Sequence, residues 1–285
     1  MRILIKLALL LLVMLVLAAA VFYQLYLKVA DYSHQGTRAA PPSTTLGEDA
    51  RWLILFDGQS LDGWTPKIVG SAAGENYLDT FRVEDGTITV SYDNYSGWNG
   101  EFGHLFYDTP FDHYILQLEY RFRGEQIAEG AAMGWAWRNS GVMIHSQAPG
   151  SMGLAQDFPV SLEAQLLGAR EGERRTTGNL CTPGTHVDIQ DDLHTQHCIN
   201  SLVAGTVGDG WVRVELEVRG NELIRHFIDG ELAIEYSRPR LDTWGGDGRS
   251  LHQAGADIAV GSGYIALQSE SHPVQFRNIR LLPLN

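Results

Sequence analysis

The sequence predicts an all-β jelly-roll sandwich preceded by one apolar N-terminal helix, and two observations predict the sandwich. Period-two alternation runs through 114–122 and 211–219, where apolar residues occupy one face and charged or amide residues the other. Asp-Gly pairs at 85–86 and 229–230 lie between apolar runs and favour tight hairpin turns. Many short strands with Gly-rich turns indicate a two-sheet sandwich or a barrel. Several strands are polar along one complete face, which favours the sandwich.

The N-terminal element is an apolar run over residues 7–27 that is long enough to cross a bilayer as a helix. Arg2 and Lys6 precede the run, so the positive-inside rule directs the rest of the chain out of the cytoplasm. Residues 18–20 are three alanines, which also fit the cleavage site of a secretory signal peptide. The apolar residues beyond them favour a retained anchor, and the cleaved signal stays open as the alternative.

Composition divides the chain and excludes one class of partner. We expect residues 1–28 to be a signal anchor or signal peptide, 29–50 a polar flexible tether and 51–285 the folded sandwich.

The 34 acidic residues outnumber the 21 basic ones, and no basic run follows residue 28. Nucleic acid is excluded as a partner, because it is bound through clustered Lys and Arg. We expect a periplasmic or cell-surface domain that contacts the membrane through its N-terminal segment, or a secreted one.

Cys181 and Cys198 are the only cysteines, and a location outside the cytoplasm predicts a disulfide between them. Such a bond closes a short His-rich loop and stabilises the fold by about 3 kcal/mol. The alternative is a metal site built from this loop, although the spacing matches no standard zinc template. The ligands of that alternative are His186, His194, His197, Asp188, Asp191 and Asp192.

Four strand-like segments place functional groups on one face, and a solvated outer face is the alternative for each. Glu163 is singled out because Leu162 and Ala164 anchor its strand in a core on the other face. Two carboxylates that face each other across a groove could act as acid and base. The polar residues of the four segments are Gln117, Glu119, Arg121, Asn139, His145, Ser161, Glu163, Gln165, Gln268, Glu270 and His272, the last two if the closing strand extends that far.

Aromatic side chains in polar or Gly-rich surroundings are candidates for stacking on sugar rings, with core packing as the alternative. They are Trp98, Trp135, Trp137 and Trp244. The sequence lacks the motifs of other catalytic chemistries, because it has no G-x-S-x-G elbow, no H-E-x-x-H pair and no phosphate-binding glycine loop.

Seven motifs follow one another in the order found in a known family. They are LFDGQSLDGW (55–64), FRVEDGTITV (81–90), LQLEYRF (116–122), NSGVMIH (139–145), SLEAQLLG (161–168), GDGWVRVELEV (208–218) and GYIALQSESHPVQFRNIRL (263–281). Together they resemble the 3-keto-disaccharide hydrolase domain, and the resemblance spans residues 51–285. It implies a concanavalin-like jelly roll similar to laminarinase-type glycoside hydrolases, located outside the cytoplasm and acting on glucosides already oxidised at C3.

The same resemblance implies a concave face that carries the catalytic and substrate-binding residues. Many family members have Asp-His-Gly where this chain has Ser269-Glu270-Ser271, so Glu270 replaces a family histidine. The chain also lacks the E-x-D-x-E strand of laminarinase-type enzymes, and their double-displacement chemistry is therefore not transferred. The implied face comprises Glu119, Arg121, Asn139, Ser140, His145, Glu163, Gln165, Gln268, Glu270 and His272.

A ketone at C3 disfavours the oxocarbenium ion of ordinary glycoside cleavage and acidifies the hydrogen on C2, so elimination becomes the expected route. We expect Glu163 to remove the C2 proton and Glu270 or His272 to protonate the departing oxygen. Arg121, His145 or a bound divalent cation would stabilise the enolate, and water would then add to complete hydrolysis. No cofactor other than such a cation is expected.

Two non-catalytic functions remain alternatives for the same fold. A carbohydrate-binding module tethered to the membrane would use the polar face to capture glycans, and a structural domain would use it to bind protein. A pair of facing carboxylates with perturbed pKa values distinguishes the enzyme, because a lectin has no need of one.

Overall fold

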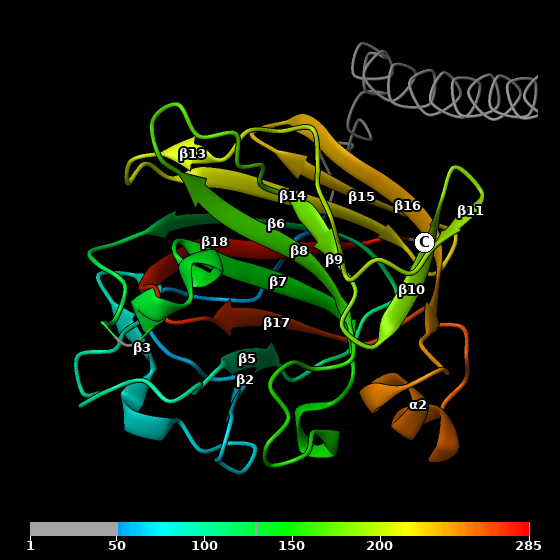
Figure 1. Cartoon of the computed structure of the whole chain (residues 1–285), viewed down its shortest axis with the longest axis horizontal. Coiled ribbons are helices and arrows are strands. Elements are labelled where there is room, and N and C mark those ends of the chain that lie inside the picture. The colour runs from blue at the N-terminus through cyan, green and yellow to red at the C-terminus, as the bar shows by residue number, and fades with distance from the viewer. Residues whose placement is uncertain (1–50, 129, 285) are drawn as a thin grey trace, which may run out of the picture. The chain divides into compact units, whose positions relative to one another are not determined.

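Two β-sheets packed face to face form the part of the chain that the computed structural model describes, residues 51–128 and 130–284 (Figure 1). Every strand pair within it is antiparallel except β13 with β8. The predicted all-β sandwich is therefore confirmed. The predicted apolar helix at 7–27 and the tether at 29–50 lie outside the described residues. None of the described helices has the length and apolar character needed to cross a bilayer.

Sheet I contains ten described strands in the order β11-β10-β16-β15-β14-β6-β18-β4-β3, with β1 beside β18. The predicted Asp-Gly turns join β3 to β4 and β15 to β16, and both residues of each turn have the positive φ that a primed turn requires. The strands are β1 (Leu53–Ile54), β3 (Phe81–Glu84), β4 (Thr87–Val90), β6 (His113–Phe122), β10 (Thr185–Ile189), β11 (Asp192–His194), β14 (Val212–Arg219), β15 (Leu223–Ile228), β16 (Glu231–Leu241) and β18 (Val274–Pro283).

Sheet II contains eight described strands in the order β12-β9-β8-β7-β17-β5-β2, with β13 beside β8. The strands are β2 (Trp64–Ile68), β5 (Gly103–Tyr107), β7 (Asn139–Ser146), β8 (Leu162–Ala169), β9 (Asn179–Cys181), β12 (Cys198–Ile199), β13 (Thr206–Val207) and β17 (Tyr264–Ser269). The described helices are short and lie in the connections: η2 (Tyr77–Asp79), η3 (Gly130–Ala132), η4 (Gly134–Ala136), η5 (Pro149–Ser151) and α2 (Gly246–Gln253). The predicted disulfide between Cys181 and Cys198 is present and joins β9 to β12.

The core lies between the sheets and follows the predicted alternation. Along β6, Leu116, Leu118 and Tyr120 are almost completely buried, whereas Glu119 between them points out of the sandwich. From sheet II, Ala164 of β8 and its neighbours on the same face meet them in a single hydrophobic cluster. Burial of this alternating apolar face is what drives the two sheets together.

The outer faces of the two sheets differ in their contact with water. On sheet I, alternate positions of β6, β14 and β16 are partly or fully exposed. On sheet II, β7 is buried along its whole length, and β8 is buried everywhere except at Gln165, so loops cover the outer face. Polar residues on this covered face are held away from bulk water, where desolvation shifts pKa values.

Candidate active site

A cavity of about 480 Å³, called the catalytic cavity below, lies on the outer face of sheet II and contains both carboxylates singled out as acid and base, Glu163 and Glu270. Its volume falls in the range of small-molecule sites, about 300–1,000 Å³. The lining residues are Trp135, Asn139, Phe158, Glu163, Gln165, Leu167, Arg175, Cys181, Pro183, His197, Cys198 and Glu270.

Glu163 lies on β8 between Met143 of β7 and Cys181 of β9, its direct partners across the sheet. Gly141 leaves the space that the carboxyl occupies, because a Cβ added there would lie 2.8 Å from Cγ of Glu163 and collide with Oε1. Glu163 is only 5% exposed. Burial raises its pKa to about 8, since the charged form loses its hydration. Near neutral pH this carboxyl can therefore both take up and release a proton.

Glu270 follows the end of β17 and reaches the same cavity. Burial raises the pKa of Glu270 well above its ordinary value, and the charge of Glu163 raises it further, while Arg175 opposes both effects. Two like charges in a buried site disfavour each other, so the two carboxyls titrate as a pair. Around neutral pH the pair retains at least one proton, which leaves an acid beside a base.

The guanidinium of Arg175 is the positive group of the catalytic cavity. Nη1 donates to the carbonyl oxygen of Gly168 (3.0 Å) and Nη2 donates to that of Trp135 (2.9 Å). Burial lowers the pKa of Arg175, yet an arginine remains charged in such a site. Arg175 could not be identified from the sequence because it lies in a loop, where no periodicity marks the direction of a side chain.

Several buried polar atoms around the cavity lack a hydrogen-bond partner among the described residues, as is common where a ligand or water binds. Oε2 of Glu270 and Oδ1 of Asn139 are two such atoms, and both residues line the cavity. Gln268 pairs across the sheet with His104, and neither side chain has a hydrogen-bond partner within residues 51–128 and 130–284. Burial and the neighbouring Lys67 lower the pKa of His104 to about 3, so its imidazole is neutral. His104 and Lys67 were not identified from the sequence.

Four of the predicted site residues meet at this cavity: Glu163, Glu270, Asn139 and Gln165. The amide of Gln165 is oriented by Asn179, whose Nδ2 donates to its Oε1 (3.0 Å). The structure therefore joins the central part of the predicted constellation, although the segments that supply it are far apart in the sequence.

The prediction that Glu119 and Arg121 share a face with Glu163 is wrong. Both lie on β6 in sheet I and point away from the core, on the opposite side of the sandwich from the catalytic cavity. Glu119 pairs with Arg277 (2.5 Å), and the guanidinium carbon of Arg121 lies 4.4 Å from the ring centroid of Trp211. These contacts make Glu119 and Arg121 part of a charged surface.

His145 and Ser140 lie on β7 but do not reach the cavity. His145 has a φ of 48° at an irregularity in the pairing with β17, and its Nε2 donates to the carbonyl oxygen of Gly220 (2.9 Å), in the turn between β14 and β15. Ser140 shares the core side of β7, and its Oγ donates to the carbonyl oxygen of Gln268 (2.9 Å). Neither residue is therefore among those that line the catalytic cavity.

The closing strand ends before His272, which was expected only if that strand continued. β17 ends at Ser269, and Ser271 has a φ of 73°, which breaks the alternation between Glu270 and His272. The ring of His272 packs edge-on against Phe122, and burial lowers its pKa to about 4. Neither His272 nor the fully buried Gln268 is among the residues that line the cavity.

Of the four tryptophans considered as sugar platforms, only Trp135 lines the catalytic cavity, where it is 54% exposed. Trp98 is buried in an aromatic cluster, as the core-packing alternative expected. Trp137 is half-buried, with the guanidinium carbon of Arg170 lying 3.9 Å from its ring centroid. Trp244 is exposed and does not line this cavity.

The alternative of a metal site in the His-rich loop is wrong. Asp188 accepts hydrogen bonds from Arg238 (2.6 Å) and from Arg240, and Asp191 pairs with Arg238. In the described ranges 51–128 and 130–284, no three His, Cys, Asp or Glu side chains form a group that could hold a metal ion. The residues around the catalytic cavity therefore do not fit the divalent cation considered for the enolate either. Among the loop histidines, His197 lines the catalytic cavity, and burial lowers its pKa.

Residues 51–282 match the model of the family described as the 3-keto-alpha-glucoside-1,2-lyase-like domain. No curated protein matches the chain in sequence. One similar solved structure is a Parabacteroides distasonis protein provisionally assigned as a glycosyl hydrolase, 16% identical, with a TM-score of 0.46 over 82% of this chain and 100% of that one. The Bacillus subtilis carbohydrate-binding module CBM66 is 8% identical, with a TM-score of 0.43 over 77% of this chain and 95% of that one. The Bacillus licheniformis β-glucanase is 7% identical, with a TM-score of 0.44 over 84% of this chain and 100% of that one.

Proposed function

Because the chain belongs to the family of 3-keto-α-glucoside-1,2-lyase-like domains, we propose that it cleaves the glycosidic bond of 3-keto-glycosides, 3-keto-disaccharides included, by elimination followed by addition of water. The observation that supports this proposal is the buried pair of Glu163 and Glu270 in one cavity. Burial raises the pKa of both carboxyls, which supplies a base and an acid at the same pH.

In the first half-reaction, ionised Glu163 removes the proton from C2, and the electron pair forms an enolate with the C3 oxygen. The enolate collapses to a C1=C2 double bond and restores the ketone as the bond between C1 and the glycosidic oxygen breaks. Glu270 protonates that oxygen as it departs. In the second half-reaction, water adds its hydroxyl to C1 and gives its proton to Glu270, while Glu163 returns a proton to C2. The net change is hydrolysis, and both carboxyls return to their starting states.

Arg175 takes the role expected of Arg121 or His145, because it carries the positive charge of the catalytic cavity. A fixed cation beside the C3 oxygen stabilises charge that develops only as the C2 proton leaves. Its hydrogen bonds to the backbone hold the guanidinium in place before the substrate binds. Asn139 and Gln165 present amide groups that can bind sugar hydroxyls. No step is assigned to a metal ion.

The decisive experiment incubates the full-length protein with a 3-keto-glucoside and with its unoxidised parent. We expect turnover of the 3-keto-glucoside alone, and a reaction in deuterated water should place deuterium at C2 of the released sugar. Glu163→Gln and Glu270→Gln should each abolish turnover, whereas Glu119→Gln on the opposite face of the sandwich should not. Turnover of the parent sugar, or a product without deuterium at C2, would contradict the elimination route.

Arg175→Gln tests the enolate role. Loss of one group that stabilises an oxyanion typically lowers kcat about 100-fold or more, and the same loss is expected here. The pH profile of the remaining activity should also move upward, because Arg175 holds the pKa of Glu270 down. Arg170→Gln is the matched control, since its guanidinium lies over Trp137 and does not line the cavity. Equal kcat values for the two variants would exclude Arg175 from this role.

A non-catalytic carbohydrate-binding module is the alternative outcome of the same assays. It requires glycan binding without turnover, and binding that Glu163→Gln leaves intact. The buried carboxylate pair speaks against it, because an acid and a base held together in a desolvated site serve proton transfer and add little to sugar recognition.

The disulfide between Cys181 and Cys198 fits an oxidising compartment outside the cytoplasm. We extend the proposal to a domain that acts at the outer side of a membrane and is retained there by residues 1–28. The mass of the mature N-terminus distinguishes a retained anchor from a cleaved signal. A mature chain that begins after residue 20 would contradict anchoring.

A further inference from the structure

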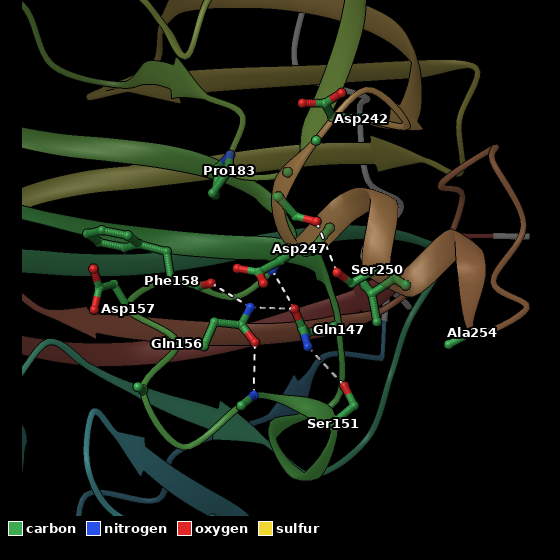
Figure 2. Close-up of a pocket in the computed structure, with 17 residues that line it drawn as sticks. Gln147, Ser151, Gln156, Asp157, Phe158, Pro183, Asp242, Asp247, Ser250 and Ala254 are labelled. Carbon is green, nitrogen blue, oxygen red and sulfur yellow. Dashed lines mark hydrogen bonds between the residues drawn. The ribbon is translucent and has the colours of Figure 1, made fainter.

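Figure 2 shows a second cavity, of about 980 Å³. It adjoins the catalytic cavity, because Phe158 and Pro183 line both. One side of the second cavity comes from the loop 147–160, and the other comes from the segment 242–254 that contains α2. The two cavities are therefore neighbours that share part of their walls, at Phe158 and Pro183.

Hydrogen bonds fix the loop that carries Phe158. Oε1 of Gln147 accepts from the backbone N–H of Val160 (2.7 Å) and from Nε2 of Gln156 (2.9 Å). Gln156 also donates to the carbonyl oxygen of Phe158 (2.8 Å), and the Phe158 ring packs 5.1 Å from that of Phe102. These contacts hold the wall in place, which lowers the free energy that binding has to supply to order it.

The opposite wall is held just as closely. The backbone N–H of Asp242 donates to the carbonyl oxygen of Gly184 (2.9 Å), next to Pro183. A Cβ added at Gly248 of α2 would collide with the Gly184 oxygen and lie 2.8 Å from the carbonyl oxygen of Asp242. Glycine at 248 therefore permits a close approach of α2 to the loop that carries Pro183. Both sides of the second cavity are built by specific contacts.

The lining of the second cavity fits an uncharged, hydroxyl-rich ligand. Its polar side chains are amides, hydroxyls and carboxylates, and none of its lining residues is Lys or Arg. Asp157 and Asp247 are exposed there, and their carboxylates make no hydrogen bond or ion pair with any other residue of the described ranges. Trp244, 69% exposed, donates its backbone N–H to the carboxylate of Asp242 (2.8 Å) beside this cavity. Carboxylates accept hydrogen bonds from sugar hydroxyls, whereas they would repel an anion.

We propose that the second cavity binds the leaving group of the substrate, and that this group is an uncharged or cationic sugar unit and not an anionic one. The inference rests on the proposed function, which places the 3-keto sugar against Glu163 and Glu270. The leaving group then passes Phe158 and Pro183 and lies against the carboxylates of the second cavity.

The test compares the full-length wild type with the double variant Asp157→Asn/Asp247→Asn on three substrates. They are methyl 3-keto-α-glucoside, maltose oxidised at C3 of its non-reducing ring, and the same derivative of maltobionate, whose leaving group is anionic. The wild type should favour the maltose derivative over the maltobionate derivative. In the variant, KM for the maltose derivative should rise about 2- to 10-fold through weakened hydrogen bonds. KM for the maltobionate derivative should fall, because the repulsion is removed.

The methyl glycoside has no group that reaches the second cavity, so its KM should stay within about twofold of the wild-type value. Asp62→Asn, an exposed aspartate that lines neither cavity, is the matched control and should change none of the three. Equal changes on all three substrates, or a wild type that prefers the anionic leaving group, would overturn the proposal.

Failure of the proposed function can be distinguished from failure of the assignment of the second cavity. If no 3-keto-glycoside is cleaved, calorimetric titration with unoxidised maltose and maltobionate measures the second cavity directly. Maltose binding that the double variant weakens, together with weaker binding of maltobionate, supports the assignment of the cavity. Equal binding of the two sugars, or no binding of either, contradicts it.

Discussion

Replacement of Glu163 by Gln should stabilise the folded protein at pH 8, although it removes the proposed base. Burial raises the pKa of Glu163 to about 8 in the folded protein, against an ordinary value of 4.5 in the unfolded chain. Between these values the folded state keeps a proton that the unfolded chain has released, so the free energy of unfolding falls as pH rises. Gln stays neutral at every pH and does not cause this fall.

The size of the effect follows from the two pKa values. Each pH unit between 4.5 and 8 lowers the unfolding free energy of the wild type by about 1.4 kcal/mol. The variant should therefore gain up to about 5 kcal/mol at pH 8 and less than about 1 kcal/mol at pH 5. Loss of the Glu163 charge also lets the pKa of Glu270 fall, which adds stability in the same direction at alkaline pH.

Urea unfolding of the full-length protein in detergent, followed by tryptophan fluorescence at pH 5 and pH 8, measures this difference. Glu119→Gln is the matched control, because it makes the same chemical change in a carboxylate paired with Arg277 on the outer face of sheet I. That control should lose about 1 kcal/mol or less at both pH values. A Glu163→Gln variant no more stable than the wild type at pH 8, with an unchanged m-value, would refute burial as the cause of the raised pKa.

Two further changes test how Glu163 is positioned and what the disulfide contributes. Gly141→Ala should lower kcat about 100-fold and Tm by only a few degrees, because the added Cβ displaces a flexible carboxyl. Gly134→Ala, where the Cβ meets open space, should change neither, and a normal kcat for Gly141→Ala would show that Glu163 tolerates displacement. Reduction of the bond between Cys181 and Cys198 should lower the free energy of unfolding by about 3 kcal/mol, measured by urea titration with and without dithiothreitol. Identical titration curves would mean that the bond leaves the unfolded chain unconstrained.

Alternation in the sequence identifies which residues face the core, but it does not identify the sheet that a strand joins. Glu119 and Glu163 are both polar residues flanked by core residues, and both point outward as expected. Pairing between distant segments decides the rest, since β6 pairs with β14 and β18 while β8 pairs with β7 and β9. The two carboxylates consequently lie on opposite sides of the sandwich.

Local backbone geometry accounts for the other differences between the predicted site and the observed one. His145 and Ser271 adopt positive φ, which reverses the alternation at those points, and neither is a glycine that would signal such a conformation in the sequence. Arg175 comes from a loop with no periodicity. Glu163 could be identified because it continues a regular strand, and Glu270 because it follows directly on one.

The disulfide and the buried carboxylate pair belong to one arrangement. Cys181 is the direct cross-strand partner of both Glu163 and Cys198, so the crosslink lies beside a carboxyl whose ionisation destabilises the fold at alkaline pH. A disulfide that closes a loop of this length contributes about 3 kcal/mol, which is of the same order as the cost of up to about 5 kcal/mol derived for Glu163. Both cysteines also line the catalytic cavity, and the bond keeps β9 paired with β12 at its wall. If this wall opened, water would reach Glu163, lower its pKa toward 4.5 and weaken it as a base. The disulfide that stabilises the fold therefore also preserves the desolvation on which the proposed proton transfer depends.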